Sequence, residues 1–335
     1  MEIQFTDVLL TVFAFVLLMV PGYVLKKVKM LPEKADSVLS TLTLYVGQPA
    51  LMVVSFLKSE YSPTIAMNML YIALLTFAVH FIMIGLVYLI IRHKGDTAKK
   101  NCVRFASVFG NCGFFGLPFL LSLFNNMGVD GQVGIYCTVV IAVFNFLNWS
   151  IGIYMVSGDK KNVTFKQVFL NPTVVCMILG VALYFIIRAP LTTIATEGTF
   201  LDVLLTKTVG SLDFLGNMVT PISMMVIGIK LANIKLKDLF LDKWAYVTSF
   251  LKLMIMPFIS ILCVYFLPIS GLVKYTLFFC MAMPSAASTV LLSIKFGGDA
   301  ESGSVFVLLS TLLSILTVPI MFLLFNGVFG VPLTI

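Results

Sequence analysis

One run of nine residues, 110–118 (GNCGFFGLP), combines three glycines, an asparagine and a proline within an apolar stretch. Proline removes a backbone donor and clashes with the preceding turn, whereas glycine permits an unwound backbone. A single proline in a helix usually produces only a kink. Because glycine, asparagine and proline occur together here, we expect the helix to break within this run.

A second run, residues 281–289 (MAMPSAAST), places Pro284 before small and hydroxylated side chains. Pro118 and Pro284 each suit the first turn of a second half-helix, where the missing N–H costs nothing. Two such breaks, crossing at the same depth, would aim two helix amino termini at one point. Unpaired amides and a partial positive charge there favour an anion such as a carboxylate. The sequence therefore predicts a site for a small organic acid.

The predicted site also includes two amide side chains outside these runs. Asn145 is suited to hydrogen-bond a carboxylate, and an interhelical structural bond is an equal alternative for it. Gln48, next to Pro49, has the same two interpretations. The predicted substrate-binding residues are Asn111, Cys112, Gly113, Phe114, Phe115, Pro118, Asn145, Gln48, Pro284, Ser285 and Ser288.

The composition of the chain indicates that residues 110–118 and 281–289 belong to a membrane protein. Of the 335 residues, 60% are hydrophobic and 11% are charged, and the mean hydropathy is +1.06. These values exclude cytosolic enzymes, DNA-binding modules and secreted disulfide scaffolds. The net charge of +7 is therefore interpreted as a signal of membrane orientation, and no nucleic acid partner is expected.

Ten apolar segments predict an all-α integral membrane protein with ten transmembrane helices. They lie near 5–25, 38–57, 64–91, 102–124, 132–157, 172–188, 208–232, 244–267, 272–296 and 303–328. The seventh is the weakest, because Lys207, Asp213 and Asn217 interrupt its first half. Basic residues follow the first segment and none precedes it, so we expect an anchor and not a cleaved signal peptide.

The basic residues also predict the orientation of the chain. Of the 22 Lys and Arg residues, seventeen fall on one side of the ten segments and one, Lys252, lies within a segment. The opposite side carries only Lys58, Arg188, Lys207 and Lys274. Because cytoplasmic loops are enriched in Lys and Arg, we expect a multi-pass protein of the cell (inner) membrane with both termini extracytoplasmic.

Ionisable side chains inside the predicted spans suggest coupling. His80 lies deep in the third span and Lys252 lies in the eighth, so either is a candidate for a coupling proton or a counter-charge. Snorkelling toward the cytoplasmic surface explains Lys252 equally well. Asp213 is either a partner of Lys252 or a residue of an outer loop.

Landmark residues repeat along the chain at similar offsets. Pro49 and Pro221 are 172 residues apart, Gly128 and Gly297 are 169 apart, and Pro118 and Pro284 are 166 apart. Five spans per copy force the copies to cross the membrane in opposite directions, as in many secondary transporters. We therefore predict a first inverted repeat over residues 1–157, a cytoplasmic connection over 158–168 and a second repeat over 169–335. The alternative is that the duplication produced only a stable helix bundle and has no role in transport.

No pattern in the sequence indicates catalysis. It has no nucleophile elbow, no phosphate-binding glycine loop and no cluster of metal ligands, so we expect neither an enzyme nor an ATP-driven pump, and no cofactor or metal. The cysteines are expected to be reduced and buried. They are Cys102, Cys112, Cys137, Cys176, Cys263 and Cys280.

Several of these features together resemble the auxin efflux carrier family, which includes plant PIN-type carriers and bacterial permeases for malate and malonate. The resemblance rests on residues 110–118, Asn171-Pro172, Pro221 with Gly228, Pro284 with Gly297 and Asp299, and the stretch from Thr311 to Pro319. Only residues 157–167 join the two halves. The chain therefore looks like the short microbial members, which puts auxin itself in doubt as the substrate.

The resemblance implies an elevator-type carrier, usually a homodimer, with scaffold helices 1, 2, 6 and 7 and a mobile unit of helices 3–5 and 8–10. It implies a fold similar to NhaA-type antiporters and bile-acid symporters, in which broken helices 4 and 9 cross at Pro118 and Pro284. The substrate carboxylate would then lie near Asn111 and Asn145. We expect a secondary transporter of small organic anions in the lipid bilayer, with an anion channel or a membrane-embedded carboxylate sensor as the alternatives.

Overall fold

The computed structural model describes residues 3–92, 97–170, 172–233 and 236–329. Within these residues all regular secondary structure is helical, and one isolated antiparallel bridge joins Gly110 to Ser285. The predicted all-α class is confirmed. Asn171, one of the residues that carry the family resemblance, lies outside the described residues.

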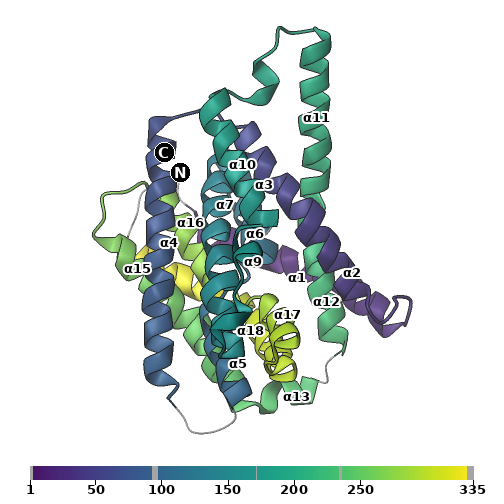
Figure 1. The fold of residues 1–335 in the computed structure, drawn as a ribbon, viewed down its shortest axis with the longest axis vertical. Helices are drawn as coiled ribbons and strands as arrows, with labels where there is room; N and C mark the ends of the chain where they lie inside the picture. Colours follow the sequence, from purple (N-terminus) through teal and green to yellow (C-terminus); the bar gives the residue numbers. More distant parts are fainter. Residues whose placement is uncertain (1–2, 93–96, 171, 234–235, 330–335) are drawn as a thin grey trace.

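The helices follow one another with short connections (Figure 1). The first half of the chain contains α1 (Phe5–Lys27), α2 (Ala35–Leu42), η1 (Thr43–Gly47), α3 (Gln48–Leu57), α4 (Pro63–Ile90), α5 (Thr97–Val108), η2 (Cys112–Gly116), α6 (Leu117–Phe124), η3 (Asn125–Met127), α7 (Asp130–Leu147), η4 (Asn148–Gly152) and α8 (Ile153–Ser157). The second half contains η5 (Lys160–Asn162), α9 (Phe165–Phe169), α10 (Pro172–Ile187), η6 (Leu191–Thr193), α11 (Phe200–Asn217), α12 (Val219–Asn233), α13 (Leu236–Leu241), α14 (Lys243–Phe250), η7 (Leu251–Ile255), α15 (Met256–Tyr265), α16 (Gly271–Ala282), α17 (Ser288–Phe296) and α18 (Ala300–Phe329).

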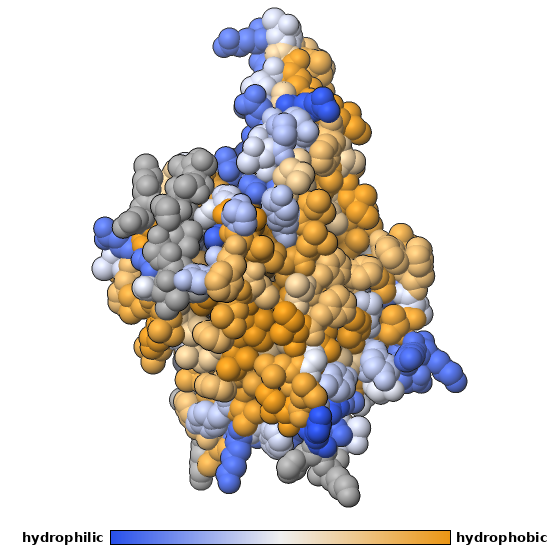
Figure 2. Space-filling view, turned by 90° about the vertical axis from the view of Figure 1, so that its left-hand side faces the viewer, coloured by the Kyte–Doolittle hydropathy of each residue, from blue (hydrophilic) through white to orange (hydrophobic). Residues whose placement is uncertain are grey.

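Eight helical stretches among the described residues are long and apolar enough to cross a membrane. They are Phe5–Lys27, Ala35–Leu57, Pro63–Ile90, Asp130–Ser157, Pro172–Thr193, Phe200–Asn233, Lys243–Tyr265 and Ala300–Gly327. Figure 2 shows a broad hydrophobic band on one face, with hydrophilic residues toward both ends of the molecule. The chain is therefore a multi-pass membrane protein.

The two remaining apolar segments are the ones with the glycine- and proline-rich runs. The segment predicted at 102–124 is divided into α5 and the continuous pair η2–α6, and the segment predicted at 272–296 is divided into α16 and α17. Each piece is too short to span a bilayer alone.

Wide helical turns precede three proline-containing helices. The π-helical segments η1, η2 and η7 each run directly into a helix with proline in its first two positions, namely Pro49, Pro118 and Pro257. Proline cannot donate to the preceding turn and its ring clashes there, so a wider turn accommodates it without ending the helix.

The start of the seventh span differs from the prediction. Helix α11 begins at Phe200, ahead of the predicted start at 208, and extends beyond the neighbouring helices at one end of the molecule (Figure 1). The charged residues do not prevent the helix because Lys207 is exposed and Asp213 forms an ion pair with Lys58. Asp213 is therefore neither a loop residue nor the partner of Lys252.

Glycines bring α1 and α12 into close contact. A Cβ atom on Gly22 would lie 2.1 Å from the Met225 carbonyl oxygen, and one on Gly228 would lie 2.0 Å from the Met19 carbonyl oxygen. Small residues let membrane helices approach until their backbones touch. Helix α3 packs in turn against α10 and α11, and α2 and η1, which directly precede α3, contact α12. Through these contacts α1, α3, α10, α11 and α12 form one packed group.

We predict that Gly228→Ala lowers the stability of the protein by about 1–3 kcal/mol, because the new methyl group overpacks the contact with α1. Thermal unfolding of the purified protein in detergent measures the change. Gly85→Ala is the matched control, since a Cβ atom on this helical glycine would meet nothing within 4 Å. Equal melting temperatures for the two variants would contradict this account of the α1–α12 contact.

Candidate functional site

The two helix breaks lie against each other and pair through their backbones. The Asn111 N–H donates to the Pro284 carbonyl oxygen at 2.7 Å, and the Ala286 N–H donates to the Phe109 carbonyl oxygen at 2.9 Å. These bonds flank the Gly110–Ser285 bridge. Unwound backbone inside a membrane must find partners within the protein, and here each break supplies them to the other. Both predicted breaks are confirmed.

Side chains satisfy the carbonyl groups that the breaks release. The last four carbonyl oxygens of a helix have no partner within it. At the end of α5, the Ser285 hydroxyl donates to the Ala106 carbonyl oxygen at 2.8 Å. At the end of α16, Lys252 Nζ donates to the Met281 carbonyl oxygen at 2.8 Å. The Ser285 N–H donates to Ser310 Oγ at 3.1 Å, which ties the crossing to α18.

The starts of the second half-helices differ from the prediction. Pro118 is the second residue of α6, but η2 precedes it without a gap, so the amino terminus of this half-helix lies at Cys112. Pro284 lies in the extended segment ahead of α17, which begins at Ser288. The expected first-turn position of Pro284 is therefore wrong, because the backbone from Met283 stays extended to pair with the other break.

The α17 terminus also offers fewer free amides than expected. The Thr289 N–H already donates to the Ala286 carbonyl oxygen at 3.0 Å, and the Val290 N–H donates to the Ala287 carbonyl oxygen at 3.2 Å. At the other terminus, the Cys112 N–H donates to the Gly110 carbonyl oxygen at 2.9 Å, and the Phe115 N–H donates to the Asn111 carbonyl oxygen at 3.1 Å. Both termini therefore have part of their first turn already paired within the protein.

A cavity of about 390 Å³ opens beside this terminus. Six of the predicted site residues line it. They are Gln48, Asn111, Gly113, Phe114, Asn145 and Ser288. The Gln48 side chain packs directly on Gly113, where a Cβ atom would lie 2.1 Å from Gln48 Nε2. The crossing and the amide side chains from α3 and α7 thus share one cavity.

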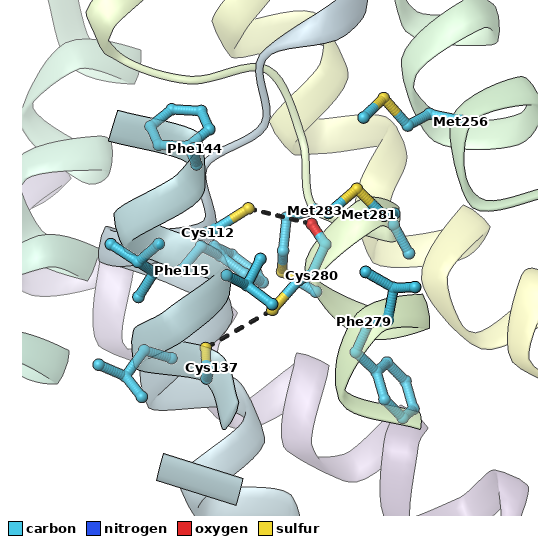
Figure 3. Packing of buried hydrophobic residues seen from close by; sticks show 14 of the residues in the cluster. Cys112, Phe115, Cys137, Phe144, Met256, Phe279, Cys280, Met281 and Met283 are labelled. Carbon is cyan, nitrogen blue, oxygen red and sulfur yellow. Dashed lines mark hydrogen bonds between the residues drawn. The ribbon is translucent and has the colours of Figure 1, made fainter. Parts of the chain in front are cut away.

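The other five predicted site residues lie behind the cavity, in the packed crossing. The Cys112 thiol donates to the Cys280 carbonyl oxygen at 3.2 Å, and the sulfur atoms of Cys137 and Cys280 are 3.5 Å apart (Figure 3). Phe115 is buried against Phe15 in an edge-to-face contact. Pro118, Pro284 and Ser285 are buried as well. These residues hold the shape of the crossing and do not face the cavity.

All six cysteines are free thiols. Four are buried, as expected, whereas Cys176 and Cys263 are only partly buried.

The two asparagines of the fifth span have different contacts. Asn145 Nδ2 donates to the Ile141 carbonyl oxygen at 2.9 Å within α7. Asn148 Oδ1 accepts from Ser288 Oγ at 3.0 Å, an interhelical bond between η4 and α17. Both residues line the cavity, but Asn145 keeps its carbonyl oxygen and one amide hydrogen for other partners.

Lys230 and Asp36 also line the cavity. No pattern in the sequence separates them from other charged residues at helix ends. Lys230 lies in the last turn of α12 and Asp36 in the first turn of α2. Within the described part of the chain no ion pair shorter than 4 Å joins them. The cavity therefore contains an ammonium group near the amino termini of the broken helices. Tyr45, Phe144 and Trp149 add aromatic surface.

The two residues proposed for coupling do not line the cavity. His80 is buried, its Nδ1 lies 2.8 Å from the Thr76 carbonyl oxygen, and its ring packs near Phe109 and Phe144. Lys252 is fully buried at the crossing. Snorkelling to the membrane surface is therefore wrong as an explanation of Lys252.

Comparison with known proteins agrees with the resemblance seen in the sequence. The model of the family described as "Membrane transport protein" matches residues 7–322. An uncharacterized transporter of Methanocaldococcus jannaschii is 24% identical over 319 residues, which cover 93% of this chain and 96% of the relative. An uncharacterized transporter of Methanothermobacter thermautotrophicus is 26% identical over 318 residues, which cover 94% of this chain and 96% of the relative.

We predict that Ser285→Ala destabilises the protein by about 1–3 kcal/mol, because the buried Ala106 carbonyl oxygen loses its side-chain donor. Ser304→Ala is the matched control, since Ser304 Oγ bonds the Ala300 carbonyl oxygen within its own helix. Thermal unfolding in detergent compares them. If Ser285→Ala were no worse than Ser304→Ala, the hydroxyl would not be needed to close the crossing.

Proposed function

The chain belongs to the membrane transport protein family, which includes the auxin efflux carriers, and we propose that it is a secondary carrier for small organic anions. The single observation that carries the substrate class is the cavity in which the amino terminus at Cys112 meets Lys230. A helix amino terminus has a partial positive charge, and the Lys230 ammonium group offsets the Asp36 carboxylate that lines the same cavity. Together they favour a carboxylate.

The remaining lining restricts the substrate further. A volume of about 390 Å³ lies within the range of small-molecule sites. The amides of Asn111 and Asn145 suit the orientation of a carboxylate by hydrogen bonds, and Tyr45, Phe114 and Trp149 suit an apolar or aromatic body. We therefore favour small organic acids with one or two carboxylates over inorganic anions.

The proposed topology has ten spans in two inverted repeats, residues 1–157 and 169–335, joined by the connection 158–168. The eight long apolar stretches supply eight of these spans. The interrupted segments 97–124 and 271–296 would supply the fourth and the ninth, at matching places in the two halves. Their breaks carry Pro118 and Pro284, the pair whose offset suggested the repeat.

The proposed mechanism is alternating access, in which a crossover unit moves against a scaffold. The packed group α1, α3, α10, α11 and α12 corresponds to the scaffold, and α4–α8 with α14–α18 to the mobile unit. The cavity draws Gln48 and Lys230 from the first group and Asn111, Asn145 and Ser288 from the second. A site shared between both groups suits an elevator-type movement, because such a movement changes the access to it.

We further propose that the cavity opens to the cytoplasm in this conformation. Asp36 and Lys230 lie at helix ends on the side that carries most of the basic residues. That orientation corresponds to the inner membrane with extracytoplasmic termini. A homodimer is the assembly that the family resemblance suggests.

Reconstituted vesicles test the proposal. We expect saturable counterflow of labelled malate, malonate or indole acetate, and we expect Asn111→Ala and Pro118→Ala to reduce flux by roughly tenfold or more while the protein stays folded. Unchanged flux in both variants would count against this site. Ohmic current under voltage would indicate a channel, and ligand binding without flux would indicate a sensor.

A second prediction concerns the lysine in the cavity. Lys230→Gln should raise the half-saturation concentration of the substrate by about tenfold or more, because a charged donor to the carboxylate is lost. Lys207→Gln is the matched control, since Lys207 is exposed on α11 and does not line the cavity. Equal half-saturation concentrations for the two variants would show that Lys230 does not bind the substrate.

A further inference from the structure

The crossing of the broken helices has two electrically different sides. On one side, the half-helices that start at Cys112 and Ser288 border the cavity with their amino termini. On the other side, α5 ends at Val108 and α16 ends at Ala282. Each helix carboxyl terminus carries about half a negative charge from its aligned peptide dipoles. The second side therefore attracts a cation as the first attracts an anion.

Lys252 occupies this second side. Its side chain is fully buried, and its Nζ donates to the Met281 carbonyl oxygen at 2.8 Å, in the last turn of α16. A Cβ atom on Gly110 would lie 2.7 Å from Lys252 Nζ, so the amine also lies against the break that follows α5. The π-helical segment η7 carries Lys252 and contacts both α5 and α16.

In the part of the chain that the structure describes, no carboxylate forms an ion pair with this amine. Among the described residues, none lies within 4 Å of Lys252 Nζ, and the titratable groups that act on it are His80, Cys112 and Cys280. An unpaired ammonium group in a membrane interior is costly. The partial charges of two helix carboxyl termini sum to about one negative charge, which matches the charge of one ammonium group.

We propose that the carbonyl ends of α5 and α16 form a monovalent-cation site whose permanent occupant is the Lys252 ammonium group. The Lys252 amine is covalently attached to the chain and occupies the position that a free cation would otherwise fill. The crossing is therefore stable without a bound ion. The consequence for coupling rests on the proposed carrier function: this site takes up no Na⁺ or K⁺ during transport. Lys252 is thus a positioning residue for the crossing and makes no contact with the substrate cavity.

Thermal unfolding in detergent tests the site without any transport assay. Lys252→Ala removes the charge and leaves space, and Lys252→Met removes the charge but fills the space. We expect both variants to melt at a lower temperature than the wild type. We also expect Na⁺, K⁺ or n-propylammonium to raise the melting temperature of Lys252→Ala saturably, by about 5 °C. The reference for this comparison is N-methylglucamine at equal ionic strength. Lys252→Met should gain nothing, and the wild type should melt equally in all four salts.

Several results would overturn the proposal. One is a Lys252→Ala protein that is as stable as the wild type in N-methylglucamine, and another is one that no small cation stabilises. A third is an increase in the melting temperature of Lys252→Met by small cations that equals the increase for Lys252→Ala. If Lys252→Ala does not fold, the binding of ²²Na⁺ to the wild-type protein is measured instead. Lys252 should exclude Na⁺ from the site, so the absence of binding would support the proposal. Stoichiometric and saturable binding would refute the proposal.

Counterflow separates this inference from the carrier proposal. Wild-type flux that is equal with and without Na⁺ and K⁺ agrees with both, and flux that requires either ion would refute the resident-cation site. Absence of flux in every salt would count against the carrier function, while the melting and binding experiments would still decide the role of Lys252.

Discussion

The structure depends on the backbone pairing between the two helix breaks. Inside a bilayer each unpaired N–H or C=O group costs several kcal/mol, so an interrupted helix persists only where another part of the protein supplies its partners. Here Asn111 and Ala286 donate to carbonyl oxygens of the opposite break on either side of the Gly110–Ser285 bridge. Because each break needs the other, two segments far apart in the sequence are held at one place.

This pairing separates the charges of four half-helices. The amino termini of η2–α6 and α17 border the cavity, and the carboxyl termini of α5 and α16 lie on the opposite side with Lys252. An intact helix would carry its charges to the membrane surfaces, where water screens them. The breaks bring them into the protein interior, where a low dielectric constant makes them effective on a bound ion. This is the physical basis on which we propose an anion as the substrate.

Tight packing keeps the crossing in position. Cys112, Cys137 and Cys280 fill the space beside the bridge with small side chains, and Phe115 packs on the first helix (Figure 3). Gly110 has no room for a side chain because Lys252 lies against it. A tightly packed interior has a low compressibility, so a movement of one part displaces the parts packed against it. The crossing and the helices around it are therefore suited to move as one body, as the proposed mechanism requires.

The sequence by itself determined the class of the protein and the position of its breaks. Hydropathy identified the apolar segments, and the glycines and prolines of residues 110–118 and 281–289 identified the two that are interrupted, because these effects act within a few residues of the chain. The same local signals identified the family. They also identified four residues of the cavity, because Asn111, Gly113, Phe114 and Ser288 belong to the breaks themselves. Gln48 and Asn145 were predicted separately, as amide side chains within apolar segments.

Only the tertiary structure decided which residues face the cavity and which lie behind it. Cys112 and Phe115 are neighbours of Gly113 and Phe114 in sequence, yet they point into the packed crossing, and no local pattern distinguishes them. Lys230 and Lys252 both resembled basic residues near helix ends, but long-range packing placed one in the cavity and buried the other. The direction of a side chain depends on contacts between distant segments, and a single sequence does not specify those contacts.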